Sequence, residues 1–103
     1  MGSGGPDWVT STRTLESAKD TGKYGQVTIN TVATLIRPAD SGRQSCTLTN
    51  QSDKDVYLGL DNLVTVNTGM AFAAFSILVN ARYTGPLYGI VASGSGKVGY
   101  IDF

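Results

Sequence analysis

The chain has 103 residues, of which 41% are hydrophobic and 16% are charged, a composition that fits one small globular domain and excludes a disordered polyelectrolyte. Eight basic residues balance eight acidic ones, so no net positive charge favours nucleic acid or an anionic membrane surface. Histidine is absent, which removes the commonest general base and the commonest metal ligand. The 13 glycines indicate many tight turns.

Residues 1–23 differ in composition from the rest of the chain, because their only substantial apolar side chains are Trp8, Val9 and Leu15. We expect them to form an N-terminal arm that becomes ordered against a partner, with a frayed tail as the alternative. We expect residues 24–103 to form the folded domain. The beginning of the chain lacks the basic and apolar regions of a signal peptide, and no apolar stretch reaches the length of a membrane span.

From residue 24 onward, short runs of alternating hydrophobicity are separated by turn residues, a pattern typical of β-strands. The runs predict strands over residues 27–29, 32–36, 44–50, 55–60, 75–79, 87–92 and 97–103, with a short additional strand over 63–66. The segment 70–75 also fits a helical turn, an interpretation that its shortness disfavours. The sequence Ser-Gly-Ser-Gly at 93–96 predicts a tight hairpin loop. Strands at this spacing predict an all-β, antiparallel sandwich of jelly-roll type, preceded by an extended arm.

The residue types that usually carry catalysis or bind metals do not form a complete motif. Cys46, the single cysteine, lies in an alternating apolar run and is predicted to be a buried hydrophobe without a disulfide partner. Asp53, Asp55 and Asp61 could supply oxygen ligands to calcium, but no calcium-loop glycine or distal glutamate completes the pattern, which favours turn roles. The segment 93–97 departs from a phosphate-binding loop in its spacing and in the residue after the lysine. We therefore predict a non-enzymatic protein with no catalytic residues, metal or cofactor.

Aromatic and arginine side chains are the better candidates for a binding surface. Tyr83 and Tyr88 bracket a loop-like sequence, and Tyr57 faces away from its apolar neighbours on a predicted strand. Three arginines flank predicted turns, where they would pair with a neighbouring subunit or remain hydrated: Arg37, Arg43 and Arg82. Few prolines or charges guard the predicted strands, so we expect copies of the chain or a larger partner to cover some strand edges or faces.

The order of several segments resembles that of small structural proteins in the virions of tailed bacteriophages. The segments are, in chain order, Val32–Ile36 (VATLI), Arg43–Asn50 (RQSCTLTN), Asp55–Gly59 (DVYLG), Asn67–Gly69 (NTG), Tyr83–Ile90 (YTGPLYGI), Ala92–Gly94 (ASG) and Val98–Tyr100 (VGY). The resemblance covers about residues 27–103. It departs at Met70–Ala74, where the family has a glycine-rich turn, and residues 1–23 match no family pattern.

The resemblance implies a head decoration (cement) protein on the outer surface of the capsid, made in the cytoplasm of the host bacterium. Its implied partners are the major capsid protein and further copies of itself, as a homotrimer, with no nucleic acid or membrane. The residues expected at these interfaces are Trp8, Leu15, Tyr57, Tyr83, Tyr88 and Arg82.

Two other functions remain as alternatives. A carbohydrate-binding or receptor-binding module of a phage tail fibre or tailspike would use Tyr57, Tyr83 and Tyr88 to stack on sugar rings. A small hydrolase with two aspartates at its centre is disfavoured, because histidine is absent and the only glutamate, Glu16, lies in the arm.

Overall fold

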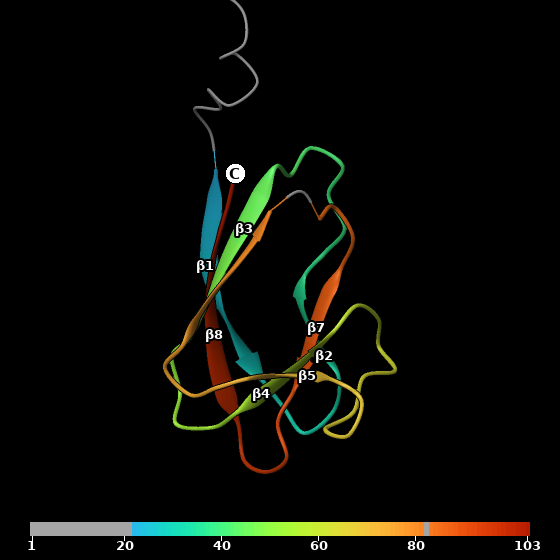
Figure 1. Cartoon of the computed structure of the whole chain (residues 1–103), viewed down its shortest axis with the longest axis vertical. Coiled ribbons are helices and arrows are strands. Elements are labelled where there is room, and N and C mark those ends of the chain that lie inside the picture. The colour runs from blue at the N-terminus through green and yellow to red at the C-terminus, as the bar shows by residue number, and fades with distance from the viewer. Residues whose placement is uncertain (1–21, 82) are drawn as a thin grey trace, which may run out of the picture.

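The computed structural model describes residues 22–81 and 83–103, and this part of the chain is all-β (Figure 1). Trp8, Leu15 and Arg82, predicted at interfaces, lie outside the described residues. The strands are β1 (Lys23–Ile29), β2 (Thr34–Arg37), β3 (Ser45–Asn50), β4 (Val56–Gly59), β5 (Met70–Phe72), β6 (Ile77–Ala81), β7 (Leu87–Ile90) and β8 (Gly96–Asp102).

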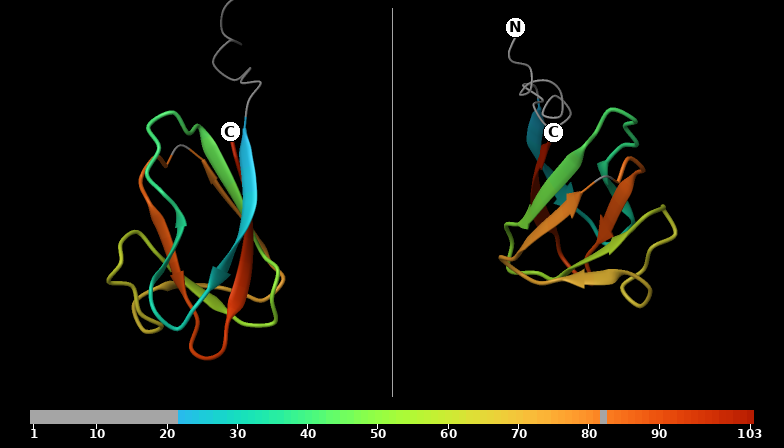
Figure 2. Two further views of the ribbon diagram at one scale, coloured as in Figure 1. Left: turned by 180° about the vertical axis from the view of Figure 1, so that it is seen from behind. Right: turned by 45° about the horizontal axis from the view of Figure 1, so that its top comes forward.

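The described strands form two four-stranded antiparallel sheets that face each other, as the two views of Figure 2 show. The first sheet has the order β1-β8-β3-β6 and the second sheet has the order β2-β7-β4-β5. The pairs β1–β8, β2–β7, β3–β6 and β4–β5 are nested, as if one long hairpin had been rolled into two layers. This strand order is that of a jelly roll. The predicted jelly-roll sandwich is confirmed.

The core lies between the two sheets and follows from the period of two along each strand. In β3, for example, Cys46 and Leu48 are buried, while Thr47 and Thr49 lie half-buried on the outer face. The predicted burial of Cys46 is confirmed. The buried apolar cluster consists of Ile29, Ile36, Cys46, Leu48, Val56, Leu58, Phe72, Leu87, Val91 and Val98.

The strand predicted over residues 63–66 is wrong, because residues 60–69 form a loop with turns. The backbone N–H of Gly69 donates to the carbonyl oxygen of Thr65 at 2.8 Å, which closes one of these turns. Val64 is buried on the outer side of β4 rather than in the core, and a Cβ atom at Gly59 would lie only 2.5 Å from the Cβ of Val64. The apolar alternation at 63–66 therefore reflects one side chain that packs on the outside of the second sheet.

Two further predictions are corrected at strand ends. The hairpin predicted at 93–96 is wrong, because β7 and β8 belong to different sheets and the loop crosses from one sheet to the other. Gly94 adopts a φ of +68°, the conformation expected of a glycine in a tight turn. The strand predicted to begin at Phe75 begins instead at Ile77, because Phe75 has a φ of 58° and breaks the extended backbone. Met70–Phe72, for which no strand was predicted, forms the short edge strand β5.

Replacing Leu48 by alanine should lower the free energy of unfolding by about 2–5 kcal/mol, because Leu48 is completely buried between the sheets. Thr49→Ala is the matched control, since its side chain lies on the outer face of the same strand. Urea denaturation followed by tryptophan or tyrosine fluorescence measures both changes. Equal losses for the two variants would contradict the assignment of the core.

Candidate functional site

Tyr57 and Tyr88 lie on the outer face of the second sheet. Each tyrosine stands between two buried residues of its strand, so its ring projects to the opposite side of the sheet. The register places Tyr88 opposite Gly59, two residues along β4 from Tyr57, so the two tyrosines are diagonal neighbours. Leu35 of β2 is paired with Tyr88 and is exposed. We call Tyr57, Tyr88 and Leu35 the tyrosine face.

The loop between β4 and β5 adds further apolar side chains next to the tyrosine face. Leu60 and Leu63 are 60% and 77% exposed, and Met70, at the beginning of β5, is 56% exposed. Together with neighbouring residues they line a shallow hollow of about 510 Å³. We call Leu60, Leu63 and Met70 the loop patch. The register pairs Met70 with Leu58, so Met70 lies at the inner side of the sheet edge, whereas Val64 holds the loop itself against Gly59 on the outer side of β4. The loop patch therefore borders the tyrosine face, and we treat the two as one candidate docking surface. Such a surface would bind by burying apolar area rather than by holding a reacting group.

Tyr83 lies apart from the tyrosine face. It precedes β7 and packs against the core, and its hydroxyl group donates to the carbonyl oxygen of Pro86 at 2.9 Å. Its own carbonyl oxygen accepts a hydrogen bond from Arg43 at 3.0 Å. Of the three tyrosines predicted to form a stacking platform, the structure therefore brings together Tyr57 and Tyr88 only, and Tyr83 holds a loop in place.

A buried ion-pair network links the two sheets near the C-terminal end of the chain. Nε and Nη2 of Arg37, in β2, lie 2.8 and 2.6 Å from Oδ2 of Asp102, in β8. Nη1 of Arg43 lies 3.7 Å from the same oxygen. The guanidinium group of Arg37 also lies 4.0 Å from the centre of the Tyr100 ring, within the range of a cation–π interaction.

Arg43 satisfies backbone groups as well as the carboxylate. Besides the carbonyl oxygen of Tyr83, it donates to those of Pro38, at 3.0 Å, and Gly85. The side chain therefore fastens the segment after β2 to the segment before β7. The prediction that Arg37 and Arg43 pair with a neighbouring subunit or remain hydrated is wrong, because both are buried and their partners lie within the same chain.

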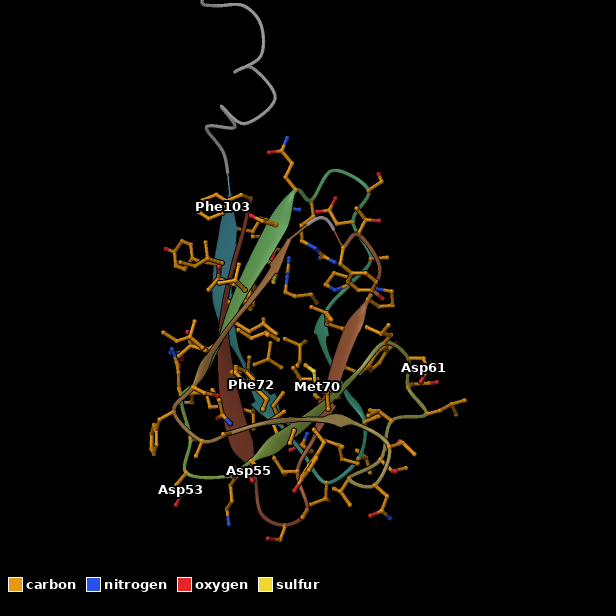
Figure 3. The ribbon with its side chains drawn as sticks, in the orientation of Figure 1. Asp53, Asp55, Asp61, Met70, Phe72 and Phe103 are labelled. Carbon is orange, nitrogen blue, oxygen red and sulfur yellow. The ribbon has the colours of Figure 1, made fainter. Side chains whose placement is uncertain are left out.

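The acidic residues that were considered as calcium ligands do not converge. Figure 3 shows Asp53 and Asp55 at the lower end of the sandwich and Asp61 on the loop at its side. Oδ1 of Asp61 accepts the N–H of Leu63 at 3.0 Å, and Oδ1 of Asp55 accepts the N–H of Ala74 at 3.3 Å. Asp61 thus stabilises a turn, as its residue type predicts. Within residues 22–81 and 83–103, no three Cys, Asp or Glu side chains are grouped to hold a metal ion.

Sequence reasoning missed a second apolar surface, on the outer face of the first sheet. The register places Tyr24, Ile101, Thr47 and Val79 in one row across the four strands. Tyr24 and Val79, at the two ends of this row, are 84% and 68% exposed. The signal was present in the alternation of 75–79, but a strand that is apolar on both faces does not reveal which face lies in the core.

Comparison with protein-family models, with curated proteins and with solved structures finds no match to this chain. In the described part of the chain, no helix is long and apolar enough to cross a membrane.

Asp102→Asn should lower the free energy of unfolding by about 3–5 kcal/mol, because it leaves the guanidinium groups of Arg37 and Arg43 buried without a counter-charge. Asp40→Asn is the matched control: its ion pair with Lys23 is solvent-exposed, so its loss should stay below about 1 kcal/mol. Urea denaturation at neutral pH measures both variants. A loss at Asp102 no larger than the loss at Asp40 would refute the role of the network.

The thiol of Cys46 should make the protein lose stability in alkali. Burial, and then the nearby Asp102 carboxylate, raise the pKa of the thiol from 9.0 to about 12. Because folding raises this pKa, the stabilising contribution of the protonated Cys46 thiol is fully present below pH 9. It is lost as the pH rises toward 12, where the unfolded chain releases this proton more readily than the folded chain. Above pH 9, the free energy of unfolding of the wild type should therefore fall by up to about 1.4 kcal/mol more per pH unit than that of Cys46→Ala. Denaturation curves from pH 7 to about 10.5 test this, and parallel pH profiles for the two proteins would contradict it.

Proposed function

We propose that this chain is a non-enzymatic structural protein of a tailed-phage virion that decorates and stabilises the outer surface of the capsid. The order of motifs over residues 27–103 supports the assignment to a virion. The fold is compatible with it, because jelly rolls are common in viral capsid proteins, although they also occur in lectins. The observation that carries the proposal is the docking surface of the tyrosine face and the loop patch, which exposes apolar side chains on the second sheet and on its β4–β5 loop.

The proposed partner of this surface is the major capsid protein. Leu60, Leu63 and Met70 are exposed in the chain alone, so binding would remove their apolar area from water. A capsid offers many identical sites, and copies that also contact one another bind together more tightly than one copy alone. The resemblance implies a homotrimer for these contacts, and we propose that Trp8 and Leu15 add a contact from the arm.

Carbohydrate binding is the second candidate function. It is favoured by one observation, the diagonal placement of Tyr57 and Tyr88 on the same outer face. Aromatic rings in this arrangement can stack on a sugar ring. Both side chains are half-buried, however, and the loop covers part of Tyr57, since a Cβ atom at Gly69 would lie 2.9 Å from the Cβ of Tyr57.

Leu63→Glu should weaken binding to undecorated heads of the encoding phage at least about tenfold, because it places a charge in the apolar contact. Leu63 is 77% exposed, so the substitution should leave the fold intact. Thr28→Glu is the matched control, an exposed position on the first sheet, and should bind as wild type does. Co-sedimentation of each purified protein with the heads measures binding.

Failure of the wild-type protein to bind heads would contradict the proposed function. Equal binding by the two variants would contradict the docking surface. Glycan-array binding that is lost in Tyr88→Ala, without any binding to heads, would support the carbohydrate-binding alternative.

A further inference from the structure

The edge strand β6 differs from the other sheet edges in the described part of the chain. In the second sheet, β5 has three residues, and β2 has four with a register shift between Leu35 and Arg37. Short strands and bulges limit pairing with another chain. In the first sheet, β1 exposes the polar side chains of Gln26 and Thr28. β6 has five residues, Ile-Leu-Val-Asn-Ala, without a charge, a proline or a register shift against β3.

The backbone of β6 presents hydrogen-bonding groups at its open edge. The N–H of Asn50 in β3 donates to the carbonyl oxygen of Ser76 at 2.9 Å. In an antiparallel pair, alternate residues direct their backbone groups toward the partner strand. The backbone N–H and C=O groups of Leu78 therefore point toward β3, like those of Ser76. The backbone groups of Ile77 and Val79 point away from β3, toward the open edge. Among the described residues, no strand other than β3 pairs with β6.

The side chains next to this open edge are apolar and exposed. Ile77 and Val79 are 69% and 68% exposed on the outer face of the first sheet. Phe75, just before the strand, is 70% exposed and has a φ of 58°, a conformation that is rare for a bulky side chain. Such a backbone conformation is strained for a residue that has a Cβ atom. The fold thus exposes the aromatic side chain of Phe75 to solvent beside β6, an apolar edge strand without a charge, a proline or a bulge.

These features indicate which kind of strand would pair with the open edge of β6. Outward N–H and C=O groups bind an extended strand, and the neutral, apolar side chains favour a strand that is itself neutral and apolar. β6 of another copy meets both requirements, and a two-fold contact brings no like charges together because β6 has none. We propose that two copies of this chain associate through β6, which pairs antiparallel with β6 of the second copy about a two-fold axis at Val79.

This contact would join the two first sheets into one continuous sheet, with Val79 opposite Val79 of the partner subunit and both outer faces on the same side. The direction of the backbone groups allows this pairing, since Val79 points both its N–H and its C=O group away from β3. The inference does not depend on the proposed capsid function. It links copies in pairs, so a trimer would have to use other surfaces.

One strand pair buries less area than the ~1,200–2,000 Å² of stable interfaces, so we expect a weak dimer. Sedimentation velocity of the full chain at up to about 500 µM should therefore show a dimer that dissociates on dilution. Val79→Pro should weaken this dimer at least about tenfold. Proline removes the outward N–H of residue 79 and leaves the bonds between β6 and β3 in place. Val79→Lys should have the same effect through charge repulsion, and it reports on the contact if the proline variant fails to fold.

Tyr24→Lys is the matched control, since Tyr24 lies on the same outer face at the opposite edge of the first sheet. It should leave the edge-to-edge dimer unchanged. A wild-type protein that remains monomeric at the highest concentration would overturn the proposal. A trimer that tolerates both Val79 variants would also overturn it, as would a dimer lost in Tyr24→Lys and retained in the Val79 variants. Head binding by a strictly monomeric protein would overturn this inference alone and leave the proposed function standing.

Discussion

The carboxylate of Asp102 is one of two buried polar links between the sheets in the part of the chain that the structure describes. The other is the side-chain amide of Asn50 in β3, which donates to the carbonyl oxygen of Phe72 in β5 at 2.9 Å. The Asp102 carboxylate is supplied by the last residue of β8 and is bound by Arg37 at the end of β2, so it connects strands at opposite sides of the sandwich. Arg43 approaches the same oxygen and also binds backbone carbonyl groups of two segments. A buried carboxylate between two guanidinium groups is stable only when the charges and donors around it are well matched. This end of the sandwich is therefore held by ion-pair and hydrogen-bond geometry, whereas the rest of the core combines apolar packing with the buried hydrogen bonds of Asn50.

The buried polar links and the apolar core both lie between the sheets, so the outer surfaces of the sandwich are available for binding. The side chains that define the tyrosine face, the loop patch and the β6 edge carry no charge. Surfaces of this kind bind through shape and buried apolar area, which suits a protein that is held in place by many neighbours. The docking surface and the β6 edge belong to different sheets, so binding to a shell and pairing between copies need not compete.

The sequence predicts most of the fold because the pattern that identifies each strand lies within the strand itself. Alternation along each strand indicates which side chains face the core, and this was sufficient for the sandwich and for the burial of Cys46. Turn chemistry at 93–96 correctly indicated a turn with a positive-φ glycine, but no local signal states that the next strand joins the other sheet. The position of Val64 was likewise hidden, because an apolar side chain that packs on the outside of a sheet resembles one that packs inside.

The candidate site was less predictable, because it depends on contacts between distant residues. Arg37 and Asp102 are 65 residues apart, and an arginine beside a turn is more often hydrated than buried. Tyr83 and Tyr88 lie near the same predicted turn, but Tyr83 packs against the core and donates to the carbonyl oxygen of Pro86, whereas Tyr88 lies on the outer face of β7. The exposure of Ile77 and Val79 follows from the register of β6 against β3, which the sequence of β6 does not determine.

We propose that this jelly roll is an adhesive component of a phage head, attached through the outer face of its second sheet. Cryo-electron microscopy of the particle produced by the encoding phage tests it most directly. We expect density for the sandwich on the outer capsid surface, with Tyr88 and Leu63 directed toward the major capsid protein. Density for the chain elsewhere in the particle, or a capsid contact made only by other faces of the sandwich, would contradict it.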